Sequence, residues 1–396
     1  MIRNIPKHYL SKLYRKLKTT INPKRYSVIL NVNGVDESNY TKLALLIYIV
    51  RPFQLRDEDP ELFRHQHLKQ CKQIAAILGE SGYIVDVVDI RNWIFRPYRD
   101  YDLVISNRVV DTHLKKDAIR IYLATTLYHI LHNRNLRRRH KLLNERRRYR
   151  VKLRRVYAEA MPYVERSNAI VCFGNEFTMS SWREAFNIPV YPFNNYGFKH
   201  TEFILEFKDF STARKNFLFL ASRSQTQKGL DLLLEIFPKH PNLHLYICSA
   251  YNSERDFSSC YYKELYETAN IHPIGWVRVN SPEYNELVRK CAFVILPSCS
   301  EGQSGSVVQC MYSGLIPLVT REVGIDTEDF GITFADDSLE EIERVIVEVS
   351  EKPETWHKEH SIRTREVSEQ KYSEDAFMNR WRYILGEILN SAGDKR

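Results

Sequence analysis

Apolar and polar positions along the chain predict strands that alternate with helices. Short apolar runs rich in β-branched residues predict strands. In the first half they lie at residues 26–32, 43–50, 83–90, 103–106, 119–123 and 169–173. Apolar residues recur at helical spacing over residues 61–78, and Gly79 and Gly82 follow where that helix ends. Buried strands separated by helices are typical of parallel sheets built from βαβ units.

The same alternation starts again after a polar stretch, Thr201–Lys215, which we interpret as a junction. In the second half, strands are predicted at residues 216–221, 243–249, 271–274, 293–297 and 316–320. Helices are predicted at residues 229–237, 261–268, 282–291, 307–312, 338–349 and 375–389. We therefore expect an α/β fold of two Rossmann-like, doubly wound domains, residues 26–205 and 206–374, facing across a cleft where ligands bind.

Composition places the chain among globular proteins. Its 396 residues are enough for two domains, and 43% hydrophobic with 27% charged residues is a usual balance. No apolar run reaches the roughly 18 residues that a membrane span needs. The basic start of the chain has no apolar signal-peptide core, so we expect a cytoplasmic protein. The seven cysteines are scattered without a CxxC pair, which argues against a zinc site and against a disulfide framework.

The net charge of +9 comes from two segments. Met1–Arg25 holds eight Lys and Arg and no acidic residue, whereas Arg134–Arg155 holds twelve and a single Glu. In the rest of the chain acidic residues outnumber basic ones. The basicity is therefore local, and each segment needs its own explanation.

The first basic segment, residues 1–25, has the pattern of a short amphipathic helix. Its apolar face consists of Leu10, Leu13, Tyr14, Leu17 and Ile21, with Lys and Arg on both sides. Such a helix lies on an anionic membrane surface, and we predict this role for Met1–Lys24. Packing of the helix on the protein itself is the alternative.

We expect the second basic segment, Arg134–Arg155, to form a helix as well. Leu142, Tyr149, Leu153 and Tyr157 recur at helical spacing and leave arginines over the remaining surface. Nucleic acid, anionic lipid and the phosphates of a substrate are three competing partners. A solvated face whose charges are paired within the protein is the fourth explanation.

The segment Phe293–Thr320 carries the chemistry. An apolar strand ends at Pro297, small residues form the loop Ser298–Ser306, and a helix begins near Val307. The N–H groups at a helix start attract anions, and Gly302 and Gly305 let the backbone approach a diphosphate closely. Glu301 at the mouth of the loop is an acceptor suited to sugar hydroxyls. A tight βα loop with an exposed Glu is the structural alternative.

This segment resembles the donor-site motif of retaining glycosyltransferases of the GT-B fold, family 4 type. That motif is approximately P-S-x-x-E-G-F-G-x-V-x-x-E-A-M-A-x-G-x-P-V. The chain supplies Pro297, Ser298, Glu301, Gly302, Met311, Gly314 and Pro317 at matching positions. The resemblance covers residues 216–331 and a last helix, within residues 375–396, of the kind that crosses back to the first domain. Residues 46–53, the helix with His67 and residues 175–178 resemble bacterial, especially cyanobacterial, members more loosely.

The resemblance implies a role for each matching residue. Arg223 and Lys228 match the family's G-R-x-x-x-x-K-G and would neutralise the leaving diphosphate. Glu301 would hold hydroxyls of the donor sugar, and Gln309 would meet the ribose. The remaining donor-binding residues are, in the loop beside the base, Gly275, Trp276 and Val277, and in the phosphate loop, Gly302, Gln303, Ser304, Gly305 and Ser306.

The chain departs from the motif at two places. Gln309 stands where the family has a second Glu, so the stronger charge-assisted bond to a ribose is lost. Gln303 and Ser304 replace the usual Phe-Gly. The family also places a first-domain His near the transferred sugar. His129 and His132 follow the strand at residues 119–123, and His129 is our candidate, with a merely packed or solvated histidine as the alternative.

We therefore expect a retaining hexosyltransferase that needs no metal and no cofactor. Its donor would be a UDP- or GDP-sugar and its acceptor a glycan or a lipid-linked molecule, in polysaccharide or glycolipid assembly at the inner membrane face. A catalytically silent protein that binds a nucleotide-sugar or nucleic acid is the alternative. The nucleic-acid version rests on Arg134–Arg155 alone, without zinc or helix-turn-helix spacing, and is the weaker one. The oligomeric state has no signal in the sequence.

Overall fold

The computed structural model describes residues 28–40, 42–92, 95–96, 99–108, 114–199, 205 and 208–393. The chain divides into two compact units. The first unit consists of Met1–Leu123, Arg166–Ala169 and Leu385–Arg396, and the second consists of Ala124–Glu165 and Ile170–Ile384. The amphipathic helix predicted at Met1–Lys24 lies outside the described residues, as do residues 201–204 and 206–207 of the predicted junction.

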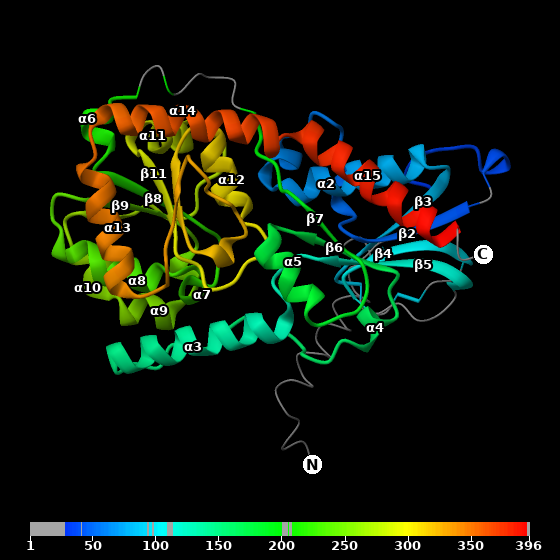
Figure 1. The fold of residues 1–396 in the computed structure, drawn as a ribbon, viewed down its shortest axis with the longest axis horizontal. Coiled ribbons are helices and arrows are strands. Elements are labelled where there is room, and N and C mark those ends of the chain that lie inside the picture. The colour runs from blue at the N-terminus through cyan, green and yellow to red at the C-terminus, as the bar shows by residue number, and fades with distance from the viewer. Residues whose placement is uncertain are drawn as a thin grey trace, which may run out of the picture. The chain divides into compact units, whose positions relative to one another are not determined.

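The first unit contains a sheet with the strand order β1-β3-β2-β4-β5. The strands are β1 (Val28–Ile29), β2 (Lys42–Tyr48), β3 (Tyr83–Asp89), β4 (Tyr101–Ser106) and β5 (Leu114–Ala124). Only β1 runs antiparallel to its neighbour, and β2, β3, β4 and β5 pair in parallel. Helix α2 (Gln66–Glu80) packs beside β3, after 3-10 turns at Glu37–Asn39, Arg51–Gln54 and Pro60–Arg64 (Figure 1). The predicted strands of this half are therefore confirmed, with β1 shorter than expected.

The second unit is built around a six-stranded sheet with the order β10-β9-β8-β11-β12-β13. Its strands are β8 (Asn216–Leu220), β9 (His244–Cys248), β10 (Ile271–Pro273), β11 (Phe293–Leu296), β12 (Ile316–Val319) and β13 (Ile332–Thr333). All neighbours pair in parallel. The order runs outward in both directions from β8 and β11, which is the doubly wound arrangement with its switch point between these two strands.

Helices cover both faces of this sheet (Figure 1). On one side lie α11 (Pro282–Lys290), α12 (Gly305–Tyr312) and α14 (Glu354–Lys371), and on the other lie α8 (Leu230–Ile236) and α10 (Tyr262–Glu267). The unit also contains α4 (Pro162–Glu165), α6 (Phe210–Ala213), α7 (Gln225–Lys228), α9 (Arg255–Cys260) and α13 (Leu339–Glu351), and 3-10 turns at Phe237–Lys239, Tyr251–Ser253 and Arg321–Val323. Strands β8, β11 and β12 are buried along their whole length, as their uninterrupted apolar sequence requires.

Two further parts complete the chain. Strands β6 (Ala169–Phe173) and β7 (Val190–Phe193) pair in parallel, with α5 (Glu176–Arg183) between them. The C-terminal helix α15 (Glu374–Gly393) begins in the second unit and ends in the first. This α/β architecture, with two Rossmann-like parts and a C-terminal helix, is the fold predicted from the sequence. In the part of the chain that the structure describes, no helix is both long enough and apolar enough to cross a membrane.

The helix predicted over Arg134–Arg155 is wrong beyond residue 147. Helix α3 runs from His129 to Arg147 and is closed by Arg148, whose backbone is left-handed at φ 47°. The chain then turns back along the helix. The Asn144 side chain accepts a hydrogen bond from Val151 N at 2.9 Å, and the Asn133 side chain contacts the Tyr157 backbone. These amide side chains replace the helical hydrogen bonds of residues 148–157.

Candidate functional site

The carboxyl ends of β8 and β11 bring two loops together at the switch point of the second unit. Residues 221–224 follow β8, and residues 297–304 follow β11 and lead into α12. In open parallel sheets, ligands bind in the crevice beside such a switch point. The fold therefore places the segment of Arg223 and the segment of Glu301 at the position where a ligand is expected.

A buried ion pair joins these two segments. Lys228 Nζ lies 2.5 Å from Glu301 Oε1, and the two side chains are only 8% and 12% exposed. Ser298 Oγ donates a second hydrogen bond to the same carboxylate oxygen, at 2.9 Å. Burial opposes the negative charge of Glu301, but the nearby Lys228 and Arg155 cations hold its pKa below the usual value. Glu301 is therefore an ionised acceptor, and Lys228 is a cation held in place.

Helix α7 positions Lys228 by clamping the β11 loop. The carbonyl of Gln227 accepts from Cys299 N at 2.9 Å and from Ser298 Oγ at 3.0 Å, and its side chain donates to Ser300 O. Gly229 ends the helix with φ 81°, and a Cβ there would lie 2.3 Å from Pro297 O. Only glycine fits this approach, so the Lys228-Gly229 pair follows from the packing of two loops.

Helix α3 holds the same loop from its other side. Asn135 Nδ2 donates to Cys299 O at 3.1 Å, and Arg139 Nη2 donates to Pro297 O at 3.2 Å. His132 Nδ1 lies 2.8 Å from Ser300 Oγ. Three successive positions along one face of α3 thus fix the backbone that precedes Glu301.

His132, rather than His129, lies beside the predicted site. His132 Nε2 is 2.8 Å from the carbonyl of Arg155, so it carries the proton, and Nδ1 accepts from the Ser300 hydroxyl. Burial lowers the pKa of His132 to about 4, and the ring is neutral at pH 7. The His129 ring instead stacks on Tyr157, with centroids 4.7 Å apart, and its Nδ1 contacts Ala158 O. Both rings contact Tyr157, because residues three apart lie on one face of a helix, but only His132 also reaches the β11 loop.

Arg155 belongs to this site and was not predicted from the sequence. Its backbone is left-handed, with φ 59°, and its carbonyl is held by His132. Its exposed guanidinium is close enough to Glu301 to lower the pKa of that carboxyl. Its only sequence signal was membership of the basic run.

Some of the residues predicted to contact phosphate are accessible to solvent, and others are bonded within the protein. Arg223 is exposed, and among the described residues the structure records no ion pair for it. Gly305 and Ser306 are half-buried at the start of α12, whereas the N–H of Ser304 already donates to Val323 O at 3.1 Å. Gly302 is buried, and a Cβ on it would meet the carbonyl of Thr125 at 2.8 Å. The half-buried start of α12 and Arg223 are thus the accessible anion-binding groups.

The two glutamines of the motif are bound to a neighbouring segment of backbone. Gln309 is fully buried; its Oε1 accepts from Phe198 N at 2.8 Å and its Nε2 donates to Phe198 O at 3.1 Å. Gln303 Oε1 accepts from Asn195 N at 2.6 Å, and its Nε2 donates to Gly324 O and to the Asn194 side chain. The structure does not bring either amide to the exposed side of the loop.

The loop predicted to lie beside the base follows β10. Both Ile274 N and Gly275 N donate to Ile247 O, and Gly275 has φ 95° with open space around its Cα. Val277 is buried, while the Trp276 side chain is 53% exposed. An exposed indole at the carboxyl edge of the same sheet is a surface on which a planar ring can stack.

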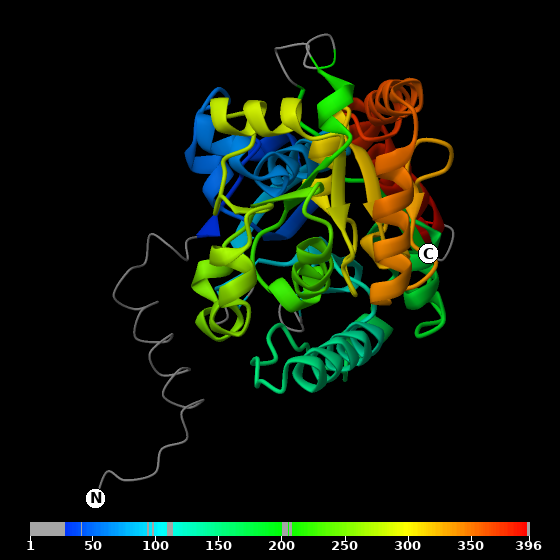
Figure 2. The same ribbon diagram turned by 90° about the vertical axis from the view of Figure 1, so that its left-hand side faces the viewer.

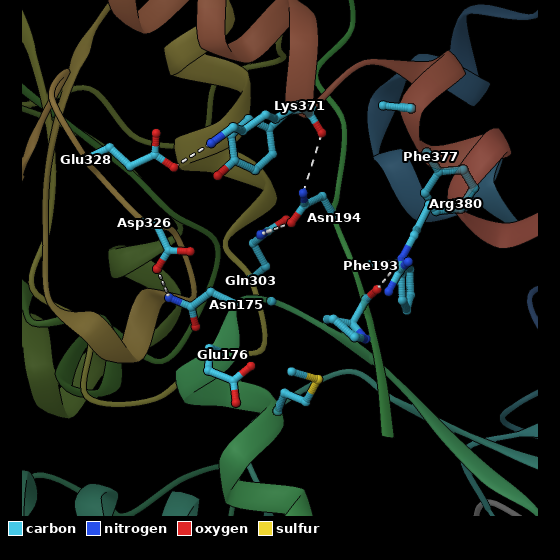
Figure 3. A pocket seen from close by; sticks show the side chains of 15 residues that line it. Asn175, Glu176, Phe193, Asn194, Gln303, Asp326, Glu328, Lys371, Phe377 and Arg380 are labelled. Carbon is cyan, nitrogen blue, oxygen red and sulfur yellow. Dashed lines mark hydrogen bonds and ion pairs between the residues drawn. The ribbon is translucent and has the colours of Figure 1, made fainter. Parts of the chain in front are cut away.

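A cavity of about 390 Å³ adjoins Gln303 (Figure 3). Asn175, Glu176 and Asp326 form one wall, and Phe193, Phe377 and Arg380 form the opposite wall. Asn175 Nδ2 donates to Asp326 Oδ1 at 2.6 Å, and beside it Lys371 pairs with Glu328 at 2.5 Å. Carboxylate and amide oxygens facing aromatic rings are suited to a polar ligand with one apolar face.

Across the described ranges, no cluster of three or more His, Cys, Asp and Glu side chains could hold a metal ion. All seven cysteines are free, and six of them are buried.

Comparison with known proteins agrees with this geometry. Residues 214–352 match the profile of the family described as "Glycosyl transferases group 1". No curated protein sequence matches the chain. The structure of sucrose-phosphate synthase from Thermosynechococcus elongatus aligns with a TM-score of 0.58 at 10% identity, over 89% of this chain and 100% of that one. HepE from Anabaena, solved in complex with UDP and glucose, aligns with a TM-score of 0.51 at 13% identity, again over 89% and 100%.

These findings define the class of the protein. The fold is that of the GT-B glycosyltransferases, and within that class residues 214–352 resemble glycosyl transferases group 1. The chain spans about half, 53%, of the length of TarM, to which it aligns over 70% of its own length at 14% identity with a TM-score of 0.49.

Proposed function

We propose that the protein transfers a sugar from a nucleoside-diphosphate sugar to an acceptor, with retention of configuration, as a family 4-type enzyme. The observation that carries the proposal is the buried Lys228–Glu301 pair at the switch point of the second unit. A cation and an ionised acceptor side by side fit the two parts of such a donor, a diphosphate and a polyhydroxylated ring. HepE, which has the same fold, was solved with UDP and glucose.

Each residue has a role in this proposal. When donor binds, Lys228 turns from Glu301 to the diphosphate, and Arg223 joins it from the solvent side; both charges then stabilise the leaving group. Glu301, released, accepts hydrogen bonds from sugar hydroxyls. The N–H groups of Gly305 and Ser306 receive a phosphate oxygen, and Trp276 stacks on the base, which we expect to belong to a UDP- or GDP-sugar.

His132 is our revised candidate for the histidine near the transferred sugar. It approaches the β11 loop directly, whereas His129 is occupied by Tyr157 and Ala158. We place the acceptor, a glycan or a lipid-linked molecule, in the cavity beside Gln303, because its oxygen-rich wall adjoins the donor loop.

Donor hydrolysis tests the proposal. UDP-, GDP- and ADP-sugars are incubated with the protein, and release of the nucleoside diphosphate is measured. We expect one donor to be hydrolysed, and Arg223→Ala and Glu301→Gln to reduce turnover. Arg363→Ala, at a half-buried arginine of α14 that pairs with Asp329, is the control and should not change it. If no donor binds and none is hydrolysed, the proposal fails.

A silent nucleotide-sugar binding protein is the second candidate, and one observation favours it. Gln309, where the family has a Glu for the ribose, gives both of its amide functions to the Phe198 backbone. A donor that raises the unfolding temperature but is not turned over with any acceptor would support this candidate over the enzyme.

A further inference from the structure

The basic run Arg134–Arg155 divides into two sets in the structure. The inner set pairs with acidic residues of the same unit: Arg139 with Asp337 at 2.7 Å, Arg146 with Asp231 at 2.9 Å and with Glu235 at 3.0 Å, Arg147 with Glu264 at 2.8 Å, and Arg154 with Asp256. These contacts hold α3 and the returning segment against the second unit. They account for four of the twelve basic residues. Three more, Arg137, Arg138 and Lys141, pair at the surface with Glu159, Asp337 and Glu145.

The outer set consists of four exposed cations, Arg134, Arg148, Arg150 and Lys152. For these four side chains, the structure records no ion pair with any described residue. An unpaired surface cation is ordinary when it is alone. Arg148, Arg150 and Lys152 lie within one short stretch and repel each other, and this repulsion is relieved when an anionic surface covers them.

Large apolar side chains are exposed in the same stretch. Ile130, Leu142, Tyr149, Leu153 and Val156 are between 38% and 46% exposed. Together with the four cations they form what we call the α3 surface. Figure 1 shows α3 at the edge of the second unit opposite α14, and Figure 2 shows the returning segment beside it on the same edge. Neither element is covered on its outer side by another described part of this unit.

The combination of the two kinds of side chain selects the partner. Single-stranded nucleic acids are bound by cations and by stacking aromatic rings, and Tyr149 is the only aromatic ring among these nine residues. Duplex DNA is bound by cations and by polar side chains that reach base edges. Aliphatic side chains such as Leu153 and Val156 gain nothing from a phosphate backbone. A membrane surface with anionic lipids uses both, because cations meet the headgroups and aliphatic side chains enter the boundary with the acyl chains.

We propose that the α3 surface attaches the protein to a membrane that contains anionic lipid. This contact is independent of the proposed transferase activity, since it involves neither Lys228 nor Glu301 and needs no donor. It would bring the site to acceptors that are held at a membrane.

Vesicle sedimentation of the full-length protein tests the proposal. Phosphatidylcholine vesicles with and without phosphatidylglycerol are compared, and we expect binding only when the anionic lipid is present. A variant with Arg148→Gln, Arg150→Gln and Lys152→Gln should bind roughly a hundredfold more weakly, at about fivefold for each charge. A variant with Leu153→Ser and Val156→Ser should bind about tenfold more weakly at unchanged charge.

Exposed residues of α14 provide the matched control. A variant with Lys358→Gln and Ile362→Ser removes a cation and an exposed aliphatic side chain from the opposite edge of the unit, and should bind like the wild type. Residues 1–27 are present in the wild type and in every variant, so their contribution to vesicle binding is the same in each protein compared. Wild-type affinity in both α3-surface variants would overturn the proposal. So would salt-sensitive binding to duplex DNA together with no binding to anionic vesicles.

Discussion

Replacing Glu301 with glutamine tests whether the ion pair at the switch point is as buried as the structure indicates. The substitution keeps the shape of the side chain and its hydrogen bond from Ser298 but leaves Lys228 without a counter-charge. With side-chain exposures of 8% and 12%, water cannot replace the lost partner. Breaking a buried pair on one side costs about 3 to 5 kcal/mol, and since Ser298 keeps its acceptor we expect about 3 kcal/mol.

Thermal unfolding followed by circular dichroism measures this loss. For a unit of this size, about 3 kcal/mol corresponds to a fall of roughly 6 to 12 °C in the unfolding temperature. Glu322→Gln is the control, because Glu322 lies near the same loop but pairs with Arg321, whose side chain is 68% exposed. Such a solvated pair contributes about 1 kcal/mol at most, so the control should unfold within a few degrees of the wild type.

The same variants show whether Lys228 is available to a diphosphate. In Glu301→Gln the free ammonium needs no separation from a partner, so UDP or GDP should raise the unfolding temperature more than in the wild type. A double variant, Lys228→Met with Glu301→Gln, should recover part of the stability and lose the response to nucleotide. The reasoning is refuted if Glu301→Gln alone unfolds within about 0.5 kcal/mol of the wild type, the usual range for surface changes.

Three further outcomes are expected. Arg223→Ala, at an exposed side chain, should leave stability unchanged but lower kcat for donor hydrolysis about a hundredfold, measured by release of the diphosphate. His132 is neutral in the folded protein, with its pKa lowered from 6.5 to about 4. The contribution of neutral His132 to the free energy of unfolding is therefore complete above pH 6.5. It is lost as pH falls toward 4, by up to about 3 kcal/mol. In His132→Gln, the free energy of unfolding measured with urea should depend less on pH across this range. Gln309→Glu should cost about 1 to 3 kcal/mol, because the carbonyl of Phe198 loses its donor, and equal urea midpoints would contradict that bond.

The central strands of both sheets were predictable because their burial is uniform, whereas β7 and β13, which are partly exposed, were not predicted. β8, β11 and β12 are apolar at nearly every position. A short apolar run that is flanked by glycine, proline or polar residues predicts a buried strand. From strands and helices in alternation, the doubly wound order follows with few alternatives. The position of a ligand site at the switch point then follows from topology rather than from any single residue.

Helix α14 was missed because the side chains it buries are polar, with Val367 as the one exception. His357, Ser361, Thr364 and Ser368 are all fully buried, so the helix has no apolar stripe. Each side chain is satisfied locally or across the packing: Thr364 Oγ1 donates to Phe330 O at 3.2 Å, and Ser361 Oγ donates to Gly314 O. A pattern of hydrophobic residues predicts only the burial of apolar side chains. Polar side chains that are buried with hydrogen-bond partners do not appear in it.

The candidate site was predictable in part. The roles of Lys228 and Glu301 came from resemblance, since residues 73 positions apart have no relation that local spacing can show. His129 and His132 lie on the same face of α3, which Leu136, Arg139 and Leu143 continue, so the choice between them depended on which turn of the helix lies beside the β11 loop. An arginine belongs to that buried face because Asp231 and Asp337 lie against it, and a pattern of hydrophobic residues cannot anticipate such a partner.

The two glutamines that depart from the family motif have a common physical explanation. A primary amide presents both N–H donors and a carbonyl acceptor, so Gln309 can pair with both the N–H and the carbonyl of Phe198. Gln303 binds the neighbouring residues Asn194 and Asn195 in a similar way. A carboxylate or a phenyl ring could not make these pairs. The departures therefore tie the donor loop and α12 to residues 194–198. It follows that a ribose can reach Gln309 only if this backbone segment moves away, and that the sugar and diphosphate contacts must hold a donor without it.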